Sequence, residues 1–335
     1  MASRKSPFIF EDAVPKDSFF NRREELDFFV RSISAKRKIL LCIVAPLKYG
    51  KSSLMMRYYE MLREFGDVVS IYIDLKKKDK PIRFIVEELK KFGIDVHEVY
   101  KESLGKNSLE FLFDKINEIM VKENKWLFLL FDEFHLLPSR IKNEGFYKGF
   151  SDEDIFGFFR GFAEGARISY VVCGSVIEPL MDALDVWGGR FQIIYLGPFS
   201  REDAINMLKK LFRDGGLSIS DEDAGLIAEA AGYHPFYMQY MGHHIYVAGI
   251  INRSTIIRAK QRLYEYLVPI FGAYLERIKK LGINYLETLR RILRGELLNI
   301  DDIVRATRLL RMGIIKPKNA KYELIDPLFK RYLES

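Results

Sequence analysis

The feature that most constrains this chain is an apolar run, residues 39–44, that leads directly into a short basic turn. The turn and the start of the next segment read Ala45, Pro46, Leu47, Lys48, Tyr49, Gly50, Lys51, Ser52 and Ser53. Between a buried strand and a helix, such a turn points successive backbone N–H groups at phosphate oxygens, and the positive helix N-terminus adds to the attraction. We therefore predict a strand, a phosphate-binding loop and a helix, with residues 45–53 binding a nucleoside triphosphate.

Two side chains of this loop have defined chemical tasks. Lys51 would reach the β- and γ-phosphates, and the hydroxyl of Ser52 would ligate Mg²⁺. The loop departs from the usual G-x-x-x-x-G-K-[ST] pattern, because Ala45 stands at the first glycine and Pro46 follows it. Alanine is a small replacement and Gly50 is kept, so the phosphate-loop interpretation holds. A basic loop without a nucleotide, and a nucleotide-binding scaffold without turnover, remain alternatives.

A second apolar run, residues 126–131, ends in the acidic pair Asp132 and Glu133. Open α/β sheets bind ligands beyond the carboxyl ends of their strands, so this pair is expected to face the phosphate loop. Asp132 would hold the Mg²⁺ shell, and Glu133 would orient and deprotonate the water that attacks the γ-phosphate. The alternative is structural, because acidic residues commonly cap the next helix.

Composition sets limits on the remaining possibilities. The chain has 335 residues, 48% of them hydrophobic, which suits packed cores in two or three domains. Its two cysteines, Cys42 and Cys173, fall inside predicted strands, so no disulfide framework is implied. No apolar run approaches the length of a membrane span, and we expect a soluble, cytoplasmic protein. The net charge of +7 permits contact with nucleic acid without demonstrating it.

The pattern of apolar residues predicts an α/β fold. Strands expected at 39–44, 68–74, 126–131, 169–175 and 192–196 alternate with helices, which indicates a parallel sheet covered on both faces. Asn21 is the expected N-cap of the first helix, with Glu24 three residues on. Residues 134–148 are expected to be rich in loops.

The composition changes twice in the second half of the chain. Helical patterns without strands follow residue 198, and from residue 253 three helices precede two short strands. The first pattern indicates a small helical lid, and the second describes a winged-helix module. We place the domains at residues 1–197, 198–252 and 253–335.

Short motifs follow one another along almost the whole chain, from residue 19 to residue 333. They are the phosphate loop, residues 20–26, 131–133, 173–175, 189–190, 196–199, 232–235 and 322–329. In this order and spacing they resemble the archaeal ATPase family of the STAND class, P-loop NTPases related to AAA+ and origin-recognition ATPases. The resemblance implies a P-loop NTPase core, a helical lid and a C-terminal winged helix, with ATP and Mg²⁺ as cofactors.

The same resemblance implies roles for further residues. Ser175 resembles a polar sensor of the γ-phosphate, although a serine capping the next helix is an equal alternative. Arg190 resembles an arginine that stabilises transition-state charge, either in its own site or across a subunit contact. A simple surface charge is the alternative. Arg22 belongs to the N-terminal motif at the nucleotide. Pro235, with Gly232, resembles the turn that lets the lid close.

The main hypothesis is a Mg²⁺-dependent ATPase that hydrolyses ATP slowly and acts as a conformational switch. The rival is an ATP-regulated DNA-binding protein, because Arg305, Arg308 and Arg311 recur along one side of the expected recognition helix. Solvated arginines are the simpler account of that pattern. A protein partner or self-association is also open, and no membrane contact is expected. The physiological process is not encoded in these motifs.

Overall fold

A five-stranded parallel sheet forms the centre of the computed structural model, which describes residues 6–10, 14, 18–35, 38–46, 48–174, 180, 185–319 and 321–334. The strands are β1 (Leu40–Val44), β2 (Val68–Asp74), β3 (Trp126–Asp132), β4 (Ile168–Cys173) and β5 (Gln192–Tyr195). Their spatial order is β2-β3-β4-β1-β5, so β4 lies between the two strands that carry the predicted site. The central strands are almost wholly buried, which explains why they are continuous apolar runs.

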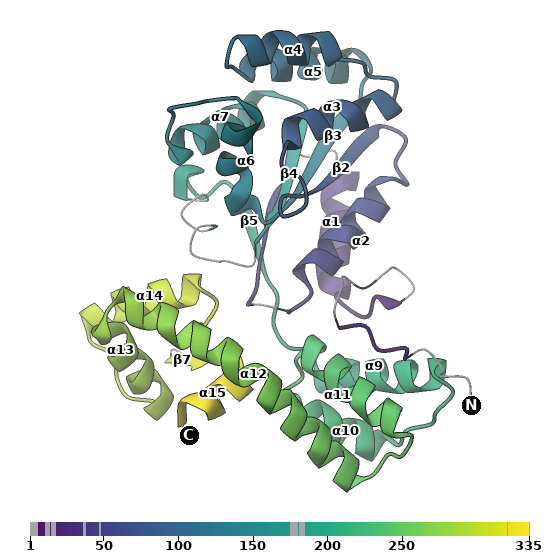
Figure 1. Ribbon diagram of the computed structural model, residues 1–335, viewed down its shortest axis with the longest axis vertical. Helices are drawn as coiled ribbons and strands as arrows, with labels where there is room; N and C mark the ends of the chain where they lie inside the picture. The colour runs from purple at the N-terminus through teal and green to yellow at the C-terminus, as the bar shows by residue number, and fades with distance from the viewer. Residues whose placement is uncertain are drawn as a thin grey trace.

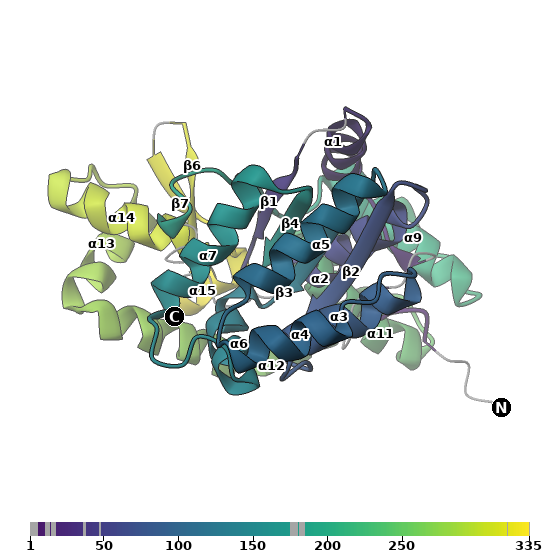
Figure 2. The same ribbon diagram turned by 90° about the horizontal axis from the view of Figure 1, so that it is seen from above.

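Helices cover both faces of the sheet, as predicted (Figures 1 and 2). One face packs against α1 (Arg23–Ser34) and α2 (Lys51–Leu62). The other packs against α3 (Pro81–Lys91), α4 (His97–Gly105), α5 (Glu110–Lys122), α6 (Leu137–Glu144) and α7 (Asp152–Gly165). Neighbouring residues of one strand therefore enter different cores.

The second half of the chain forms its own hydrophobic core. Three helices make the lid: α9 (Arg201–Asp214), α10 (Asp221–Ala230) and α11 (Pro235–Ala248). In Figure 1 the long helix α12 (Arg253–Leu281) runs from this lid to the C-terminal module. That module, called the winged helix below, contains α13 (Ile283–Arg294), α14 (Ile300–Arg311), β6 (Ile315–Lys318), β7 (Lys321–Leu324) and α15 (Pro327–Glu334). The predicted fold class is confirmed.

Several local predictions were wrong. Asn21 does not cap α1: the N-cap is Arg22, in the left-handed region with φ 64°, and no side chain caps that helix end. The stretch expected to be loops contains a 3₁₀ turn (Phe134–Leu136) followed by α6. Helices α4 and α15 were not expected. None of the helices among the described residues has the length and apolar character needed to cross a membrane.

Helix α6 has a structural role that its polar sequence conceals. Its last residue, Glu144, is buried and accepts hydrogen bonds from the backbone N–H groups of Ile82 at 2.9 Å and Arg83 at 2.6 Å. The hydroxyl of Tyr100 donates to the same carboxylate at 2.9 Å. Glu144 therefore caps the N-terminus of α3 from a distant part of the chain, and an anion there also suits the helix dipole.

We predict that Glu144→Ala lowers the free energy of unfolding by roughly 2 kcal/mol or more, because two buried N–H donors and a hydroxyl lose their acceptor. Urea denaturation followed by circular dichroism measures the change. The control is Glu118→Ala, which removes an exposed ion pair with Lys115 and should cost less than about 1 kcal/mol. Equal midpoints for the two variants would contradict the capping role.

Candidate functional site

The loop after β1 turns sharply and starts a helix, as its sequence predicts. Gly50 is the N-cap of α2 with φ 89°, and Lys48 also has a positive φ of 68°. A Cβ added to Gly50 would meet nothing within 4 Å, so backbone conformation rather than crowding favours glycine there. Leu47 lies outside the described residues. The turn directs the first N–H groups of α2 toward the edge of the sheet where β1 ends.

Lys51, the first residue of α2, is only 7% exposed. Its ammonium donates to the carbonyl oxygens of Ala45 at 2.8 Å and Pro46 at 2.9 Å. Burial lowers the pKa of Lys51, while the negative charges of Glu133 and Asp132 act in the opposite direction. The lysine is thus folded back on its own loop, in a position where phosphate oxygens can replace the two carbonyls.

The carboxylate of Asp132 lies at the end of β3 and is held from both sides. The hydroxyl of Tyr72, in β2, donates to its Oδ2 at 3.0 Å. The thiol of Cys173, in β4, donates to its Oδ1 at 3.0 Å. Burial is the largest cause of a raised pKa for both Tyr72 and Cys173, and the adjacent Asp132 charge raises it further. Both groups are therefore protonated donors.

Glu133, the next residue, adopts the left-handed conformation with φ 60°, and its side chain is buried. It forms an ion pair with Lys76, which lies in the segment between β2 and α3. The Nδ1 atom of His135 lies 3.6 Å from the other carboxylate oxygen. Burial lowers the pKa of His135. A carboxylate beside a lysine and a neutral imidazole can accept a proton once it is turned toward a water.

The phosphate loop and the acidic pair meet at one edge of the sheet. All five strands are parallel, so the loop after β1 and the residues that end β3 lie at the same edge, separated by β4. The charges of Asp132 and Glu133 act on the Lys51 ammonium. The Lys51 ammonium and the carboxylates of Asp132 and Glu133 thus lie around one region at this edge. Ser52 follows Lys51 in the first turn of α2.

A pocket next to this edge joins three parts of the chain. Its lining brings together the N-terminal segment, the start of α2 and the lid: Val14, Ser18, Phe19, Phe20, Arg22, Tyr49, Gly50, Ser53, Phe199, Met207, Pro235 and Gln239. The predicted binding residues Arg22 and Pro235 therefore lie at one pocket with the phosphate loop. Val14, Met207 and Gln239 were not predicted, because no local pattern distinguishes them from ordinary core and loop residues. Phe199 belongs to the motif 196–199 but was given no role.

Arg22 fixes the N-terminal side of this pocket. Its guanidinium donates to the carbonyl oxygens of Gly197 at 2.8 Å and Tyr49 at 3.4 Å, and it lies over the ring of Phe199 at 4.9 Å. Burial lowers the pKa of Arg22, which Glu25 partly offsets. One side chain thus ties α1 to the phosphate loop and to the segment that leads into the lid.

The N-terminal segment also reaches both the lid and the helix of the phosphate loop. The N–H of Val14 donates to the hydroxyl of Ser53 at 3.0 Å, and the N–H of Ile9 donates to Gln239 at 3.1 Å. Phe8 packs edge-on against Phe212 of the lid. The described parts of the N-terminal segment, residues 6–10 and Val14, therefore contact the lid and the start of α2.

Comparison with known proteins identifies the family. A family model described as an ATPase domain predominantly from Archaea matches residues 19–241. The chain belongs to this family of archaeal ATPases. An ATP-binding protein of Pyrococcus abyssi of uncharacterized function is 24% identical over 301 residues, which cover 76% of this chain and 84% of the relative. A similar ATP-binding protein of Methanocaldococcus jannaschii is 22% identical over 338 residues, covering 90% and 88%.

Solved structures agree on the fold of this archaeal ATPase. The Walker-type ATPase of Pyrococcus abyssi has a TM-score of 0.70 at 18% identity and covers 98% of this chain and 100% of its own. The ORC2 protein of Aeropyrum pernix has a TM-score of 0.58 at 13% identity, with 97% and 95% covered. The predicted resemblance is confirmed, and the loop and the acidic pair lie within the matched ATPase domain.

One predicted residue, Arg190, is not brought to the site of this archaeal ATPase. Ser175 lies outside the described residues. Arg190 is about half exposed, forms an ion pair with Glu164, and lies two residues before β5. Because Leu41 near the start of β1 pairs with Gln192, Arg190 lies at the edge opposite the phosphate loop. Contact with phosphate in its own molecule is therefore not supported, while a role across a subunit contact stays a prediction.

Proposed function

We propose that this archaeal ATPase is a Mg²⁺-dependent, slowly hydrolysing ATP switch of the STAND type. The observation that carries this proposal is the meeting of Lys51, Asp132 and Glu133 at one edge of the sheet. Lys51 would exchange its two carbonyl partners for β- and γ-phosphate oxygens, which are stronger acceptors because they are charged. The triphosphate would lie across the N-terminus of α2. The nucleoside would lie beside Arg22 and Pro235, where the pocket of about 60 Å³ would have to widen to admit it.

The donor set at this edge fits Mg²⁺. Ser52 supplies a hydroxyl and Asp132 a clamped carboxylate, and Mg²⁺ typically takes one or two protein oxygens with phosphates and waters. Ser52 and Asp132 would hold the ion. When bound, the ion neutralises charge that develops on the β- and γ-phosphate oxygens.

Glu133 is the proposed general base. Its carboxylate is next to Asp132 in sequence and can orient a water for attack on the γ-phosphate. The ion pair with Lys76 competes with that task, since a carboxylate held by an ammonium is a weaker base. Turnover would then require Lys76 to release Glu133, which supports a slow rate.

A chain of contacts supports a switch that reports the nucleotide to the winged helix. Tyr49 in the phosphate loop lies 3.9 Å, between ring centres, from His234, which precedes α11. His234 stacks on Tyr237 at 3.8 Å, and the hydroxyl of Tyr237 donates to Asp326. Asp326 in turn accepts from the N–H groups of residues 328 and 329, at the start of α15. The path therefore joins the phosphate loop, the lid and the C-terminal module.

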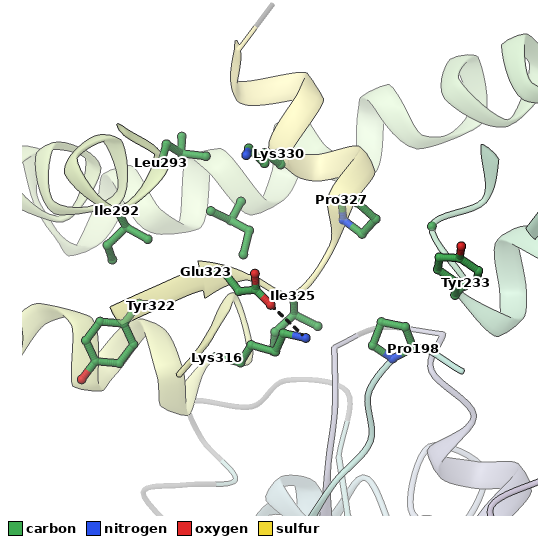
Figure 3. Close-up of a pocket in the computed structure, with 12 residues that line it drawn as sticks. Pro198, Tyr233, Ile292, Leu293, Lys316, Tyr322, Glu323, Ile325, Pro327 and Lys330 are labelled. Carbon is green, nitrogen blue, oxygen red and sulfur yellow. Dashed lines mark ion pairs between the residues drawn. The ribbon is translucent and has the colours of Figure 1, made fainter. Parts of the chain in front are cut away.

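The hinge between lid and winged helix combines one tight contact with an open cavity. Gly232 has a φ of 59°, and a Cβ there would lie 2.1 Å from a carbon of Pro327. Figure 3 shows the cavity beside it, about 380 Å³, with Pro198 and Tyr233 on one side and the ion pair of Lys316 and Glu323 on the other. The cavity leaves room for the winged helix to move relative to the lid.

Two substitutions separate nucleotide binding from hydrolysis. Lys51→Ala should abolish ATP binding, because it removes the cation that faces the phosphates. Glu133→Gln should leave binding intact and lower the rate of phosphate release at least about 100-fold, since the general base is lost. Filter binding and a phosphate-release assay measure the two effects. Lys101→Ala, at an exposed position in α4, is the control. Unchanged hydrolysis in Glu133→Gln removes Glu133 from the base role.

Breaking the contact chain should uncouple the winged helix from the nucleotide. In the wild type we expect the distance between probes on α5 and α14 to differ between ADP and a non-hydrolysable ATP analogue. Tyr237→Phe removes the hydrogen bond to Asp326 and should shrink this difference, while Tyr285→Phe in the C-terminal module should preserve it. Pulsed electron spin resonance gives the distances. A difference of wild-type size in Tyr237→Phe would exclude this path.

The side chains of α14, the expected recognition helix, suit a protein partner better than DNA. Arg305 pairs with Asp302 of its own helix at 3.3 Å, and Arg311 pairs with Asp185 of the core at 2.7 Å. The large apolar residues that α14 exposes include Ile300 at 80% and Val304 at 65%. Two of the three arginines are thus paired with carboxylates of the same chain, and apolar residues facing water do not suit a phosphate backbone. A second copy of the chain is one such protein partner.

We therefore expect no specific, salt-sensitive binding of duplex DNA. A helix that used three arginines on phosphates would lose affinity with a slope of about −3 in log affinity against log salt. A gel-shift titration from low to physiological salt, with and without ATP, tests this. A steep slope that Arg305→Ala and Arg308→Ala both reduce would instead establish the DNA-binding alternative.

A further inference from the structure

The carboxylate of Asp132 accepts hydrogen bonds from two side chains that belong to no phosphate-binding motif. Tyr72 donates to one of its oxygens and Cys173 to the other, each at 3.0 Å. We propose that Tyr72 and Cys173 are positioning residues that aim the Asp132 carboxylate at the divalent ion. This inference rests on the proposed function, because it assumes that Asp132 serves the metal.

The strand register makes this clamp rigid. Asp132 ends β3, where it pairs with Asp74 of β2, and its predecessor Phe131 pairs with Val172 of β4. Tyr72 and Cys173 therefore project from the two strands that flank β3 in the sheet. Donors on both sides restrict rotation of the carboxylate about its last bond, which a single hydrogen bond does not achieve.

The two hydrogen bonds leave lone pairs of the Asp132 carboxylate free to bind a metal ion. Each carboxylate oxygen has two lone-pair directions, and each donor occupies one of them. The remaining directions can accept from a metal-bound water or meet the ion itself. Partners that orient metal-binding groups commonly change metal affinity by about 10- to 100-fold when removed. Both donors are neutral, so they orient Asp132 without cancelling its charge.

The chain offers a matched control for each donor. Cys42 is also a buried cysteine on a central strand, but it packs in the core on the opposite face of the sheet from Cys173. Tyr170 is a buried tyrosine on β4, and its hydroxyl has no hydrogen-bond partner among the described residues. Substituting these two residues disturbs the same sheet without touching Asp132.

The test measures how much Mg²⁺ tightens nucleotide binding. Calorimetric titration with a non-hydrolysable ATP analogue, in Mg²⁺ and in EDTA, gives the ratio of the two dissociation constants for each variant. Tyr72→Phe and Cys173→Ala should each lower this ratio about tenfold, with affinity in EDTA unchanged. Cys173→Ser keeps a donor and should recover most of the ratio. Cys42→Ala and Tyr170→Phe should match the wild type.

Asp132→Ala separates this inference from the function on which it rests. If Asp132→Ala leaves the ratio unchanged, Asp132 does not serve the metal, and both the metal role and the clamp are overturned. If Asp132→Ala lowers the ratio but Tyr72→Phe and Cys173→Ala do not, the clamp alone is overturned. A loss of affinity in EDTA as large as that in Mg²⁺ marks a merely structural effect and also overturns it. Tyr72→Phe decides the question if Cys173→Ala fails to fold.

Discussion

The arrangement of the site depends on a lysine that is buried before any phosphate arrives. Removing an ammonium from water is costly unless hydrogen bonds and opposite charge compensate it. Lys51 obtains both, from the carbonyls of Ala45 and Pro46 and from the charges of Asp132 and Glu133. These partners come from the two segments that the parallel sheet brings to one edge. The folded sheet therefore stabilises the cation, and the cation in turn holds the loop in a phosphate-binding shape.

The sequence predicted those parts of the site that depend on backbone patterns. The apolar runs before Ala45 and Asp132 predicted buried parallel strands, and a parallel sheet must place the ends of those strands at one edge. The sequence pattern did not predict side chains that act on a residue of another strand. Tyr72 and Cys173 are indistinguishable from core residues until the order of β2, β3 and β4 is known.

The other differences between prediction and structure also have identifiable structural causes. Glu144 caps α3 from 61 residues away in sequence, so the polar stretch around it could not be recognised as a structural helix. Arg190 was assigned by its resemblance to a family arginine, but it precedes β5, and the direction of a strand decides which edge a residue occupies. Arg22 lies at the pocket because its side chain connects α1 to the phosphate loop and to Gly197, which precedes the lid. The motif that contains Arg22 does not reveal these partners.

The contacts between the phosphate loop and the winged helix would suit the proposed switch, because each of them is individually weak. Stacked aromatic rings contribute about 0.5–1.5 kcal/mol beyond their burial, and one hydrogen bond to a carboxylate about 1.5–3 kcal/mol. Coupling free energies between sites in proteins are typically about 1–3 kcal/mol. A nucleotide that moves Tyr49 by changing the loop would therefore need to break only one contact of this path, the one to His234, to uncouple the rest.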